Sequence, residues 1–271
     1  MHSNKLNYKV ALVTGSSQGI GKAIAVELIK NGAAIVINGQ NADKLRKAEA
    51  ELKTYGNRVF AVCGDISNPK NAEFIIDEVI GHFGRLDIVI NNAGIALKGN
   101  IADTDPGVYK KVLDVNVMGS VNMCRFALPH LRETHGSIVF ISSVAGIRGL
   151  PGFSAYSCSK MALRAVAESL RIEEATNNIH VGLMYVGFTE NELQKQMLTA
   201  NGNWETMKKR KDFKLQTREE VARAVIKNLL EKKFTMNLTF LGKLNMIMQK
   251  IAPRLVEKIL IRAAHKKEAL A

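Results

Sequence analysis

A hydroxyl, a phenol and an amine lie close together in the sequence between residues 143 and 160. Tyr156 and Lys160 are four residues apart, so a helix beginning after Gly152 would place both side chains on one face. A free phenol ionises near pH ~10, and a nearby ammonium group favours its anion, so Lys160 would bring Tyr156 toward proton exchange at neutral pH. Ser143 would then hold the substrate oxygen. An ordinary amphipathic helix also explains the pair, because Tyr-x-x-x-Lys alone is a weak pattern.

A glycine-rich segment near the N-terminus supplies the context for this chemistry. The apolar run at residues 9–13 ends in T-G-S-S-Q-G-I-G at residues 14–21, and a helical pattern continues to Lys30. Glycines let the backbone approach a pyrophosphate, and the start of the helix offers free N–H groups and a positive dipole end. We predict a dinucleotide site that contains Gly15, Ser17, Gln18, Gly19, Ile20 and Gly21.

Strands and helices alternate along the rest of the chain. Short apolar strands are predicted at residues 33–38, 58–63, 86–90, 137–142, 179–184 and 234–240, and the helix after residue 106 is predicted to run to about residue 131. This alternation predicts an α/β fold, a Rossmann-type doubly wound parallel sheet of about seven strands with helices on both faces. Residues 1–240 would form the cofactor-binding and catalytic domain, and residues 241–271 a C-terminal helical extension.

The ligand of such a sheet binds beyond the carboxyl ends of the strands. Asp65, next to Ile66, could bond the adenine amine at this edge, and Asn92, Ala93 and Gly94 could pass beneath the ribose. A helix cap and a turn are the structural alternatives for these two segments.

The end of the second strand bears on the choice of cofactor. A carboxylate there would bond the ribose hydroxyls and repel a 2′-phosphate, whereas a basic residue would attract the phosphate. The sequence has Asn38-Gly39-Gln40-Asn41, which is neither. Amide donors and a new helix N-terminus tolerate a 2′-phosphate, so NADP is favoured over NAD, with Gln40 as a contact.

Five motifs, taken together, resemble the short-chain dehydrogenase/reductase family, in the group whose glycine motif reads T-G-x-x-x-G-x-G. The matching residues are T14-G-S-S-Q-G-I-G21, N91-N-A-G94, Asn116, Ser143 and Y156-S-C-S-K160. Their order and spacing agree, including the thirteen positions from Ser143 to Tyr156, and the match covers roughly residues 8–190. The resemblance implies an NAD(P)-dependent oxidoreductase that interconverts a ketone and a secondary alcohol.

The resemblance also implies a role for each matching residue. Tyr156 would be the acid and base, and Ser143 would orient and polarise the carbonyl. Lys160 would bond the nicotinamide ribose, and Asn116 would hold a water molecule in a proton relay, although a satisfied buried amide is the usual explanation of such an asparagine. Thr189 would bond the nicotinamide carboxamide.

The segment after the sixth strand departs from the family pattern at one position. Val186 stands where the family usually has proline before Gly187, which bears on the rigidity of the loop. Residues 190–215 show no clear periodicity, so a substrate lid, as in the family, and a solvated loop are both open.

Basic residues concentrate at the C-terminal end of the chain. Of the net charge of +13, residues 201–271 contribute 17 Lys and Arg against 7 Asp and Glu. Apolar residues at 241, 244, 247, 248 and 251 follow helical spacing among these cations, and Pro253 suits the first turn of a second helix. Peripheral contact with anionic lipid at the inner membrane face and packing in an oligomer are both open for this tail. The tail resembles those of family members acting on lipophilic ketones, so a bulky apolar substrate is favoured.

Composition narrows the remaining possibilities. The sequence has no signal-peptide pattern and no apolar run of membrane-spanning length, so a cytoplasmic protein is expected. Three widely spaced cysteines argue against disulfides and structural zinc, and no metal is expected. The basic charge lacks any nucleic-acid motif, so nucleic acid is not an expected partner. By the resemblance, a homodimer or homotetramer is expected.

Two classes of function remain at this point. The first is the NADP-dependent ketone reductase or alcohol dehydrogenase described above. The alternative is a non-catalytic nucleotide-binding sensor or scaffold protein. The presence of Ser143, Tyr156 and Lys160 together favours the enzyme.

Overall fold

The computed structural model describes residues 5–190, 196–207 and 215–268. A seven-stranded sheet forms its centre, with strand order β10-β7-β6-β4-β1-β2-β3, and all its strand pairs are parallel. The strands are β1 (Val10–Val13), β2 (Ala34–Gly39), β3 (Val59–Cys63), β4 (Ile88–Asn91), β6 (Ser137–Ser143), β7 (His180–Val186) and β10 (Thr235–Asn237). The predicted doubly wound parallel sheet is confirmed.

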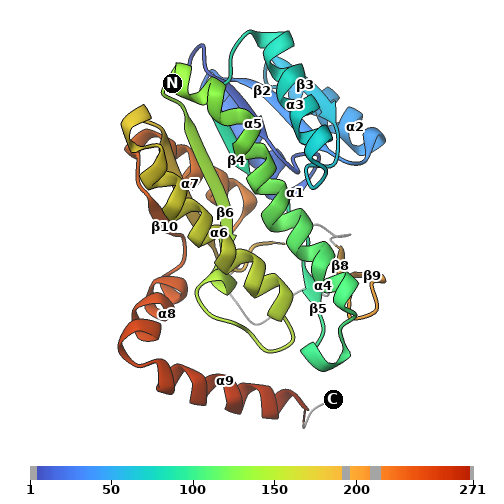
Figure 1. The fold of residues 1–271 in the computed structure, drawn as a ribbon, viewed down its shortest axis with the longest axis vertical. Helices are drawn as coiled ribbons and strands as arrows, with labels where there is room; N and C mark the ends of the chain where they lie inside the picture. Colours follow the sequence, from blue (N-terminus) through green and yellow to red (C-terminus); the bar gives the residue numbers. More distant parts are fainter. Residues whose placement is uncertain (1–4, 191–195, 208–214, 269–271) are drawn as a thin grey trace.

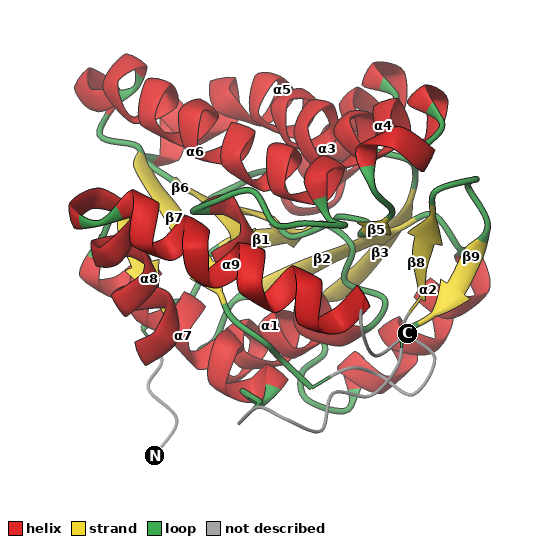
Figure 2. Ribbon diagram, turned by 90° about the horizontal axis from the view of Figure 1, so that it is seen from below, coloured by secondary structure: helices red, strands yellow, loops and turns green. Residues whose placement is uncertain are grey.

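Helices cover both faces of this sheet, as Figure 2 shows. One layer is formed by α1 (Gly19–Lys30), α2 (Ala42–Lys53) and α7 (Arg218–Glu231), and the other by α3 (Pro69–Phe83), α5 (Gly119–Thr134) and α6 (Ser154–Glu173). Strand β1 shows why both layers form, because Ala11 and Val13 belong to the first core and Val10 and Leu12 to the second. Alternate residues of a strand point to opposite faces, so an apolar run is buried on both sides.

The helix predicted at residues 106–131 is interrupted. Helix α4 (Pro106–Leu113) continues through a π-helical segment (Asp114–Met118) into α5, which ends at Thr134. The prediction of one regular helix was therefore wrong in its middle turn, where Asn116 lies. Insertions of this type are rare and are frequently found at functional sites.

A second, smaller sheet lies beside the first. Strand β5 (Leu97–Lys98) pairs in parallel with β8 (Gln196–Thr199), which pairs in antiparallel fashion with β9 (Trp204–Thr206). Leu97 and Leu198 are buried with Val112 of α4. These strands belong in part to the segment that was left open as lid or solvated loop, and its residues 191–195 and 208–214 lie outside the described part of the chain.

The chain continues beyond β10 into two helices, α8 (Phe240–Ile251) and α9 (Pro253–Glu268). The strand predicted at residues 234–240 is shorter than expected, because β10 ends at Asn237 and Thr239 caps α8 by accepting a hydrogen bond from the Gly242 N–H. Proline stands at the first position of α9, as predicted. Figure 1 shows α9 beyond the carboxyl ends of the central strands, at the end of the molecule that also holds α4 and β5.

Candidate functional site

The loop between β1 and α1 packs directly on the loop after β4. Gly15 has a φ of +61°, and a Cβ atom there would lie 2.8 Å from the Cα of Ala93. A Cβ atom at Gly21 would lie 2.5 Å from both Asn92 Nδ2 and the Gly15 carbonyl oxygen. Real Cβ atoms do not approach other atoms this closely, so the contact between these two loops requires glycine at both positions.

Hydrogen bonds fix the same contact. Asn92 donates from Nδ2 to the carbonyl oxygens of Thr14 (2.9 Å) and Gly15 (3.0 Å). The Thr14 hydroxyl in turn accepts from the backbone N–H groups of Asn92 and Ala93, each at 3.0 Å. The Asn92 side chain therefore holds together the two loops that the sequence predicts to border the cofactor.

The start of α1 has the features of an anion site. Gln18 precedes the helix in extended conformation and is exposed, its side chain makes no capping bond, and the first turn contains no acidic residue. Ser17, before Gln18, and Ile20, in the first turn of α1, are half-buried. The N–H groups of a first helical turn have no partner within the helix, and the positive end of the dipole favours negative charge. Together with the glycine contacts, this geometry fits the pyrophosphate of a dinucleotide.

The end of β2 divides into a buried part and an exposed part. The Asn38 side chain is buried and donates to the carbonyl oxygens of Val62 and Gly64, both at 3.1 Å. Gln40 is exposed, and Asn41 caps α2 by accepting from the Lys44 N–H at 2.9 Å. The exposed residue Gln40 and a capped helix start therefore border the position where a dinucleotide ribose lies in folds of this type.

Asp65 and Ile66 lie in the loop after β3. The Asp65 carboxylate accepts hydrogen bonds from Ser67, at 2.9 Å from its N–H and 2.7 Å from its hydroxyl. The helix cap of α3 is Asn68, which accepts from the Lys70 N–H. The Ile66 carbonyl oxygen accepts from Asn122 Nδ2 at 3.0 Å, so α5 holds this loop.

Tyr156 and Lys160 both lie on α6, as the sequence pattern required. Lys160 is 4% exposed, and its Nζ donates to the Ile141 carbonyl oxygen at 2.9 Å. The same Nζ lies 5.8 Å from the centroid of the Tyr156 ring. Ser143 ends β6, and its Oγ accepts from the Ala145 N–H at 3.2 Å. Strand β6 and helix α6 thus bring the hydroxyl-bearing strand end and the Tyr–Lys pair to the same edge of the sheet.

Asn116 connects this group to the loop after β4. It is fully buried, exchanges two hydrogen bonds with the backbone of Ile95 (2.8 and 2.9 Å), and donates to Ser159 Oγ at 2.9 Å. Ser159 donates to the Tyr156 carbonyl oxygen at 2.7 Å. A Cβ atom at Gly94 would lie 3.1 Å from Asn116 Oδ1 and 3.4 Å from Lys160 Nζ. Both expectations for Asn116 remain compatible with this geometry, because a satisfied amide can also border a relay.

The loop after β7 is another loop at the carboxyl edge of the central sheet. Val186 is the last residue of β7 and lies opposite Ser143 in the parallel ladder. Thr189 is half-buried, its hydroxyl donates to the Gly187 carbonyl oxygen at 3.3 Å, and its backbone forms a bridge with Gln216. The departure from proline at residue 186 therefore lies inside a regular strand.

Three contributing residues were missed by sequence reasoning. Ser159 bridges Asn116 and Tyr156, and its only signal was its place one residue before Lys160. Asn122 holds the loop of Ile66 from α5. Arg148, in the loop before α6, donates to Gln249 Oε1 at 2.7 Å across more than a hundred residues of sequence, a contact that no local pattern indicates.

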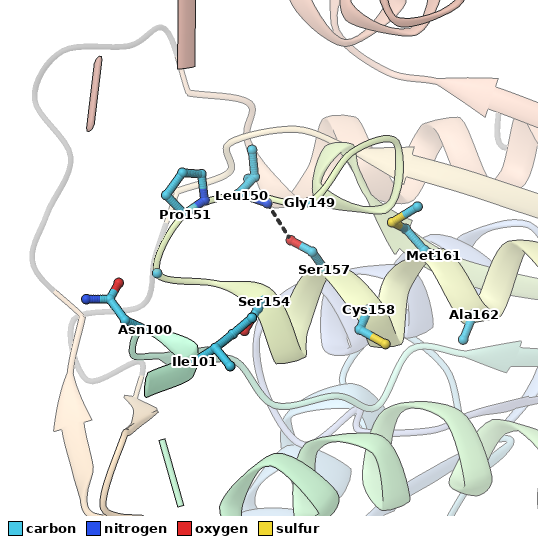
Figure 3. Close-up of a pocket in the computed structure, with 11 residues that line it drawn as sticks. Asn100, Ile101, Gly149, Leu150, Pro151, Ser154, Ser157, Cys158, Met161 and Ala162 are labelled. Carbon is cyan, nitrogen blue, oxygen red and sulfur yellow. Dashed lines mark hydrogen bonds between the residues drawn. The ribbon is translucent and has the colours of Figure 1, made fainter. Parts of the chain in front are cut away.

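A cavity of about 740 Å³ opens beside this loop. Figure 3 shows Leu150 and Pro151 on one side of it and Ser154, Ser157, Cys158 and Met161 of α6 on another, with a hydrogen bond from the Leu150 N–H to Ser157 Oγ at 3.3 Å. By helical spacing, these α6 side chains leave a different face from Tyr156 and Lys160. The cavity is therefore a neighbour of the candidate catalytic group and is not lined by it.

Two further features bear on metal ligands and on the buried thiol of Cys124. Across residues 5–190, 196–207 and 215–268, no three His, Cys, Asp or Glu side chains gather as a metal site would require. Burial raises the pKa of the Cys124 thiol to about 12, although a hydrogen bond from Asn91 lowers it in part. This thiol therefore stays protonated at neutral pH and is a poor nucleophile.

Comparison with known proteins gives consistent matches. The family model described as short chain dehydrogenase matches residues 9–202. The 11-beta-hydroxysteroid dehydrogenase 1A of Arabidopsis thaliana is 38% identical over 195 residues, which cover 70% of this chain and 55% of that protein. The chain thus aligns with little more than half the length of that relative.

Solved structures match over a larger share of their length. A short chain dehydrogenase/reductase from Burkholderia phymatum in complex with NAD superposes with a TM-score of 0.81 at 22% identity, covering 93% of this chain and 96% of that one. An alcohol dehydrogenase from Thermococcus sibiricus complexed with 5-hydroxy-NADP gives a TM-score of 0.74 at 26% identity, covering 84% and 95% respectively.

Proposed function

The chain belongs to the short-chain dehydrogenase family, and from this premise we propose that it is an NAD(P)-dependent oxidoreductase that interconverts a ketone and a secondary alcohol. One observation carries the proposal. The buried Lys160 ammonium lies beside the Tyr156 ring and near Gly94, so it borders the proposed cofactor loop and the proposed proton donor together. Removing an ammonium group from water is costly, and buried ionisable groups of this kind are typical of functional sites.

Different residues of the chain have different roles in carbonyl reduction. A bound nicotinamide supplies hydride to the carbonyl carbon. Tyr156 donates its phenolic proton to the carbonyl oxygen as negative charge develops there, and the Lys160 charge favours the phenolate that remains. Ser143 donates a hydrogen bond to the same oxygen and orients it. In the oxidative direction Tyr156 accepts the proton from the alcohol.

The residues described above hold the cofactor in this proposal. The Gly15–Gly21 loop and the start of α1 bind the pyrophosphate, and Asp65 and Ile66 border the adenine. Asn92, Ala93 and Gly94 form the wall beneath the ribose, Lys160 bonds the nicotinamide ribose, and Thr189 bonds the carboxamide. Asn116 positions the water of a relay that reaches Lys160.

NADP is the proposed cofactor. Gln40 and the α2 N-terminus meet the position of the 2′ substituent, and neither repels a phosphate. A Gln40→Asp variant would place a carboxylate there. Its affinity for NADPH should fall at least about tenfold relative to NADH, measured by the fluorescence of the bound reduced cofactor, because like charges would face each other. A ratio of NADPH affinity to NADH affinity that is unchanged from the wild type would contradict this placement.

The proposal also covers the substrate, the location in the cell and the oligomeric state. A bulky lipophilic carbonyl compound is the proposed substrate, supported by the apolar surfaces of the C-terminal helices and by the steroid named in the Arabidopsis relative. We place the protein in the cytoplasm, with peripheral membrane contact through these helices. A homodimer or homotetramer is proposed, supported by Met118 and Met161, which are exposed beside the candidate site.

The proposal is tested by following reduced-cofactor consumption over a panel of ketones graded by apolar size. Turnover that rises with apolar size is expected, and cofactor binding is measured separately by thermal shift. Tight cofactor binding without turnover of any ketone would instead favour the non-catalytic sensor or scaffold.

A further inference from the structure

Helices α8 and α9 leave a run of apolar side chains uncovered by the rest of the described chain. On α8 these are Leu241, Leu244, Ile247 and Ile251, and on α9 they are Leu255 and Ile259. Ile247 is 53% exposed and Ile251 76% exposed, and Gly242 is the buried residue of α8. Isolated exposed apolar residues are normal on a protein surface, but a contiguous set marks an interaction site.

The uncovered face of α8 is opposite the face that contacts the fold. Met246 packs against a core cluster, and Gln249 accepts the hydrogen bond of Arg148. Leu244, Ile247 and Ile251 are three and four residues apart, so they share the other side of the helix. Helix α8 is therefore apolar on the side that faces away from the rest of the described chain. Apolar side chains there do not stabilise the fold by burial.

Cations border this apolar face. Between residues 240 and 262 the chain has Lys243, Lys250, Arg254, Lys258 and Arg262, against the single carboxylate of Glu257. Lys243 and Lys250 are seven residues apart along one edge of the α8 face, and Lys258 and Arg262 are four apart beside Leu255 and Ile259. An apolar face flanked by cations is complementary to an anionic lipid surface, with acyl chains below and phosphates at the edge.

We propose that α8 and α9 form a docking surface for an anionic membrane, with their apolar faces in the interface and their cations among the headgroups. No described helix combines the length and apolar character that a span would need, so the helices would lie along the surface. A second copy of the chain is a poorer occupant, because two such surfaces would bring like charges together and lysine is depleted in interface cores.

The docking surface is attached to the loops of the candidate site, and this consequence rests on the proposed function. Arg148 bonds Gln249 and, at 3.4 Å, the Pro253 carbonyl oxygen at the α8–α9 junction. A Cβ atom at Gly242 would lie 2.9 Å from Val144 Cγ1, directly after Ser143. Figures 1 and 2 show α9 lying across the carboxyl edge of the sheet. Docking would hold this edge against the lipid, so that an apolar substrate enters from the bilayer.

Flotation with vesicles of phosphatidylglycerol and phosphatidylcholine tests the proposal. The full chain should float with these vesicles at low salt, and less with pure phosphatidylcholine or at high salt. Ile247→Asp/Ile251→Asp and, separately, Lys250→Glu/Lys258→Glu should each reduce the bound-to-free ratio by about tenfold or more. The control is Ile172→Asp on α6, which changes an isoleucine about as exposed (78%) as Ile251 (76%) but outside the surface, and it should float as the wild type does.

Folding of each variant is verified by its thermal transition and by cofactor binding. The proposal is overturned if the wild type does not float, or if Ile247→Asp/Ile251→Asp floats equally well. A different result would also overturn it. Light scattering would show that the wild type is an oligomer and that Ile247→Asp/Ile251→Asp dissociates it, while neither the wild type nor this variant binds vesicles. Flotation needs no turnover, so a protein that floats but reduces no ketone would refute the proposed function alone.

Discussion

The Lys160 ammonium donates a hydrogen bond to the Ile141 carbonyl oxygen at 2.9 Å, two residues before Ser143. Ser142 Oγ donates in return to the Lys160 carbonyl oxygen at 3.0 Å. A Cβ atom at Gly146 would lie 2.7 Å from that carbonyl oxygen, so the loop after β6 also packs closely on α6. These contacts fix the Tyr156 helix against the strand end that presents Ser143, and they give one buried lysine both a structural and a proposed chemical role.

The chemical role of Lys160 predicts a change in pH dependence. In Lys160→Met the packing volume is nearly kept, but the charge beside the phenol is lost. The rate of alcohol oxidation should then require a higher pH, because a positive charge nearby lowers the pKa of a phenol. The pH–rate profile of oxidation measures this directly. Reduced turnover with an unchanged profile would show that the lysine acts by position alone.

Matched glycine substitutions test the packing of the cofactor loop. Gly21→Ala should destabilise the fold by about 1–3 kcal/mol and abolish cofactor binding, because its Cβ would meet Asn92 and Gly15. Gly81→Ala in α3 has no atom within 4 Å of the new Cβ and should stabilise by roughly 0.5–1 kcal/mol. Denaturant unfolding with cofactor titration gives both quantities. Similar effects at the two positions would contradict the close contact.

Asn116 is expected to act by holding the loop after β4 and helix α6 in position. Asn116→Ala would leave the N–H and C=O groups of Ile95 without their side-chain partner and should cost about 1–3 kcal/mol of stability. Turnover should fall more than cofactor affinity, because the Ser159 link to α6 is lost as well. Kinetic constants measured beside unfolding curves separate these effects. A variant with native stability and native turnover would refute the role.

The sequence was sufficient for the central sheet, because buried strands and glycine loops are local patterns that repeat at each crossover. It was sufficient for Tyr156 and Lys160 as well, since their spacing places them on one helix face. The π-helical turn at Asn116 was missed because the apolar periodicity continues through it. Strands β5, β8 and β9 are too short for a period to emerge, and the Arg148–Gln249 contact depends on tertiary folding alone.

The burial of His180 predicts that the fold loses stability at acid pH. Burial, with the nearby charges of Lys232 and Arg171, lowers the pKa of His180 to about 4, against 6.5 in the absence of structure, and its Nε2 lies 3.1 Å from Asn228 Oδ1. Below pH 6.5 the unfolded chain binds the proton and the folded chain does not, so stability falls as pH drops from 6.5 to 4. When the pH falls from 7 to 5, this histidine should lower the free energy of unfolding by roughly 2 kcal/mol.

The comparison variant for this loss is His180→Gln, unfolded by denaturant at both pH values. It should be less stable than the wild type at pH 7 and show a smaller loss at pH 5, because its side chain does not titrate. The same loss in both proteins would assign the acid sensitivity to other groups.

The proposed role of Tyr156 is tested most directly by removing one oxygen atom. Tyr156→Phe should bind the reduced cofactor as the wild type does, while ketone turnover falls by about 10²–10⁴, the usual contribution of a positioned acid or base. Tyr109→Phe, in α4, is the matched control and should stay within a few-fold of the wild type. Unchanged turnover in Tyr156→Phe, with cofactor binding intact, would contradict the account of this site.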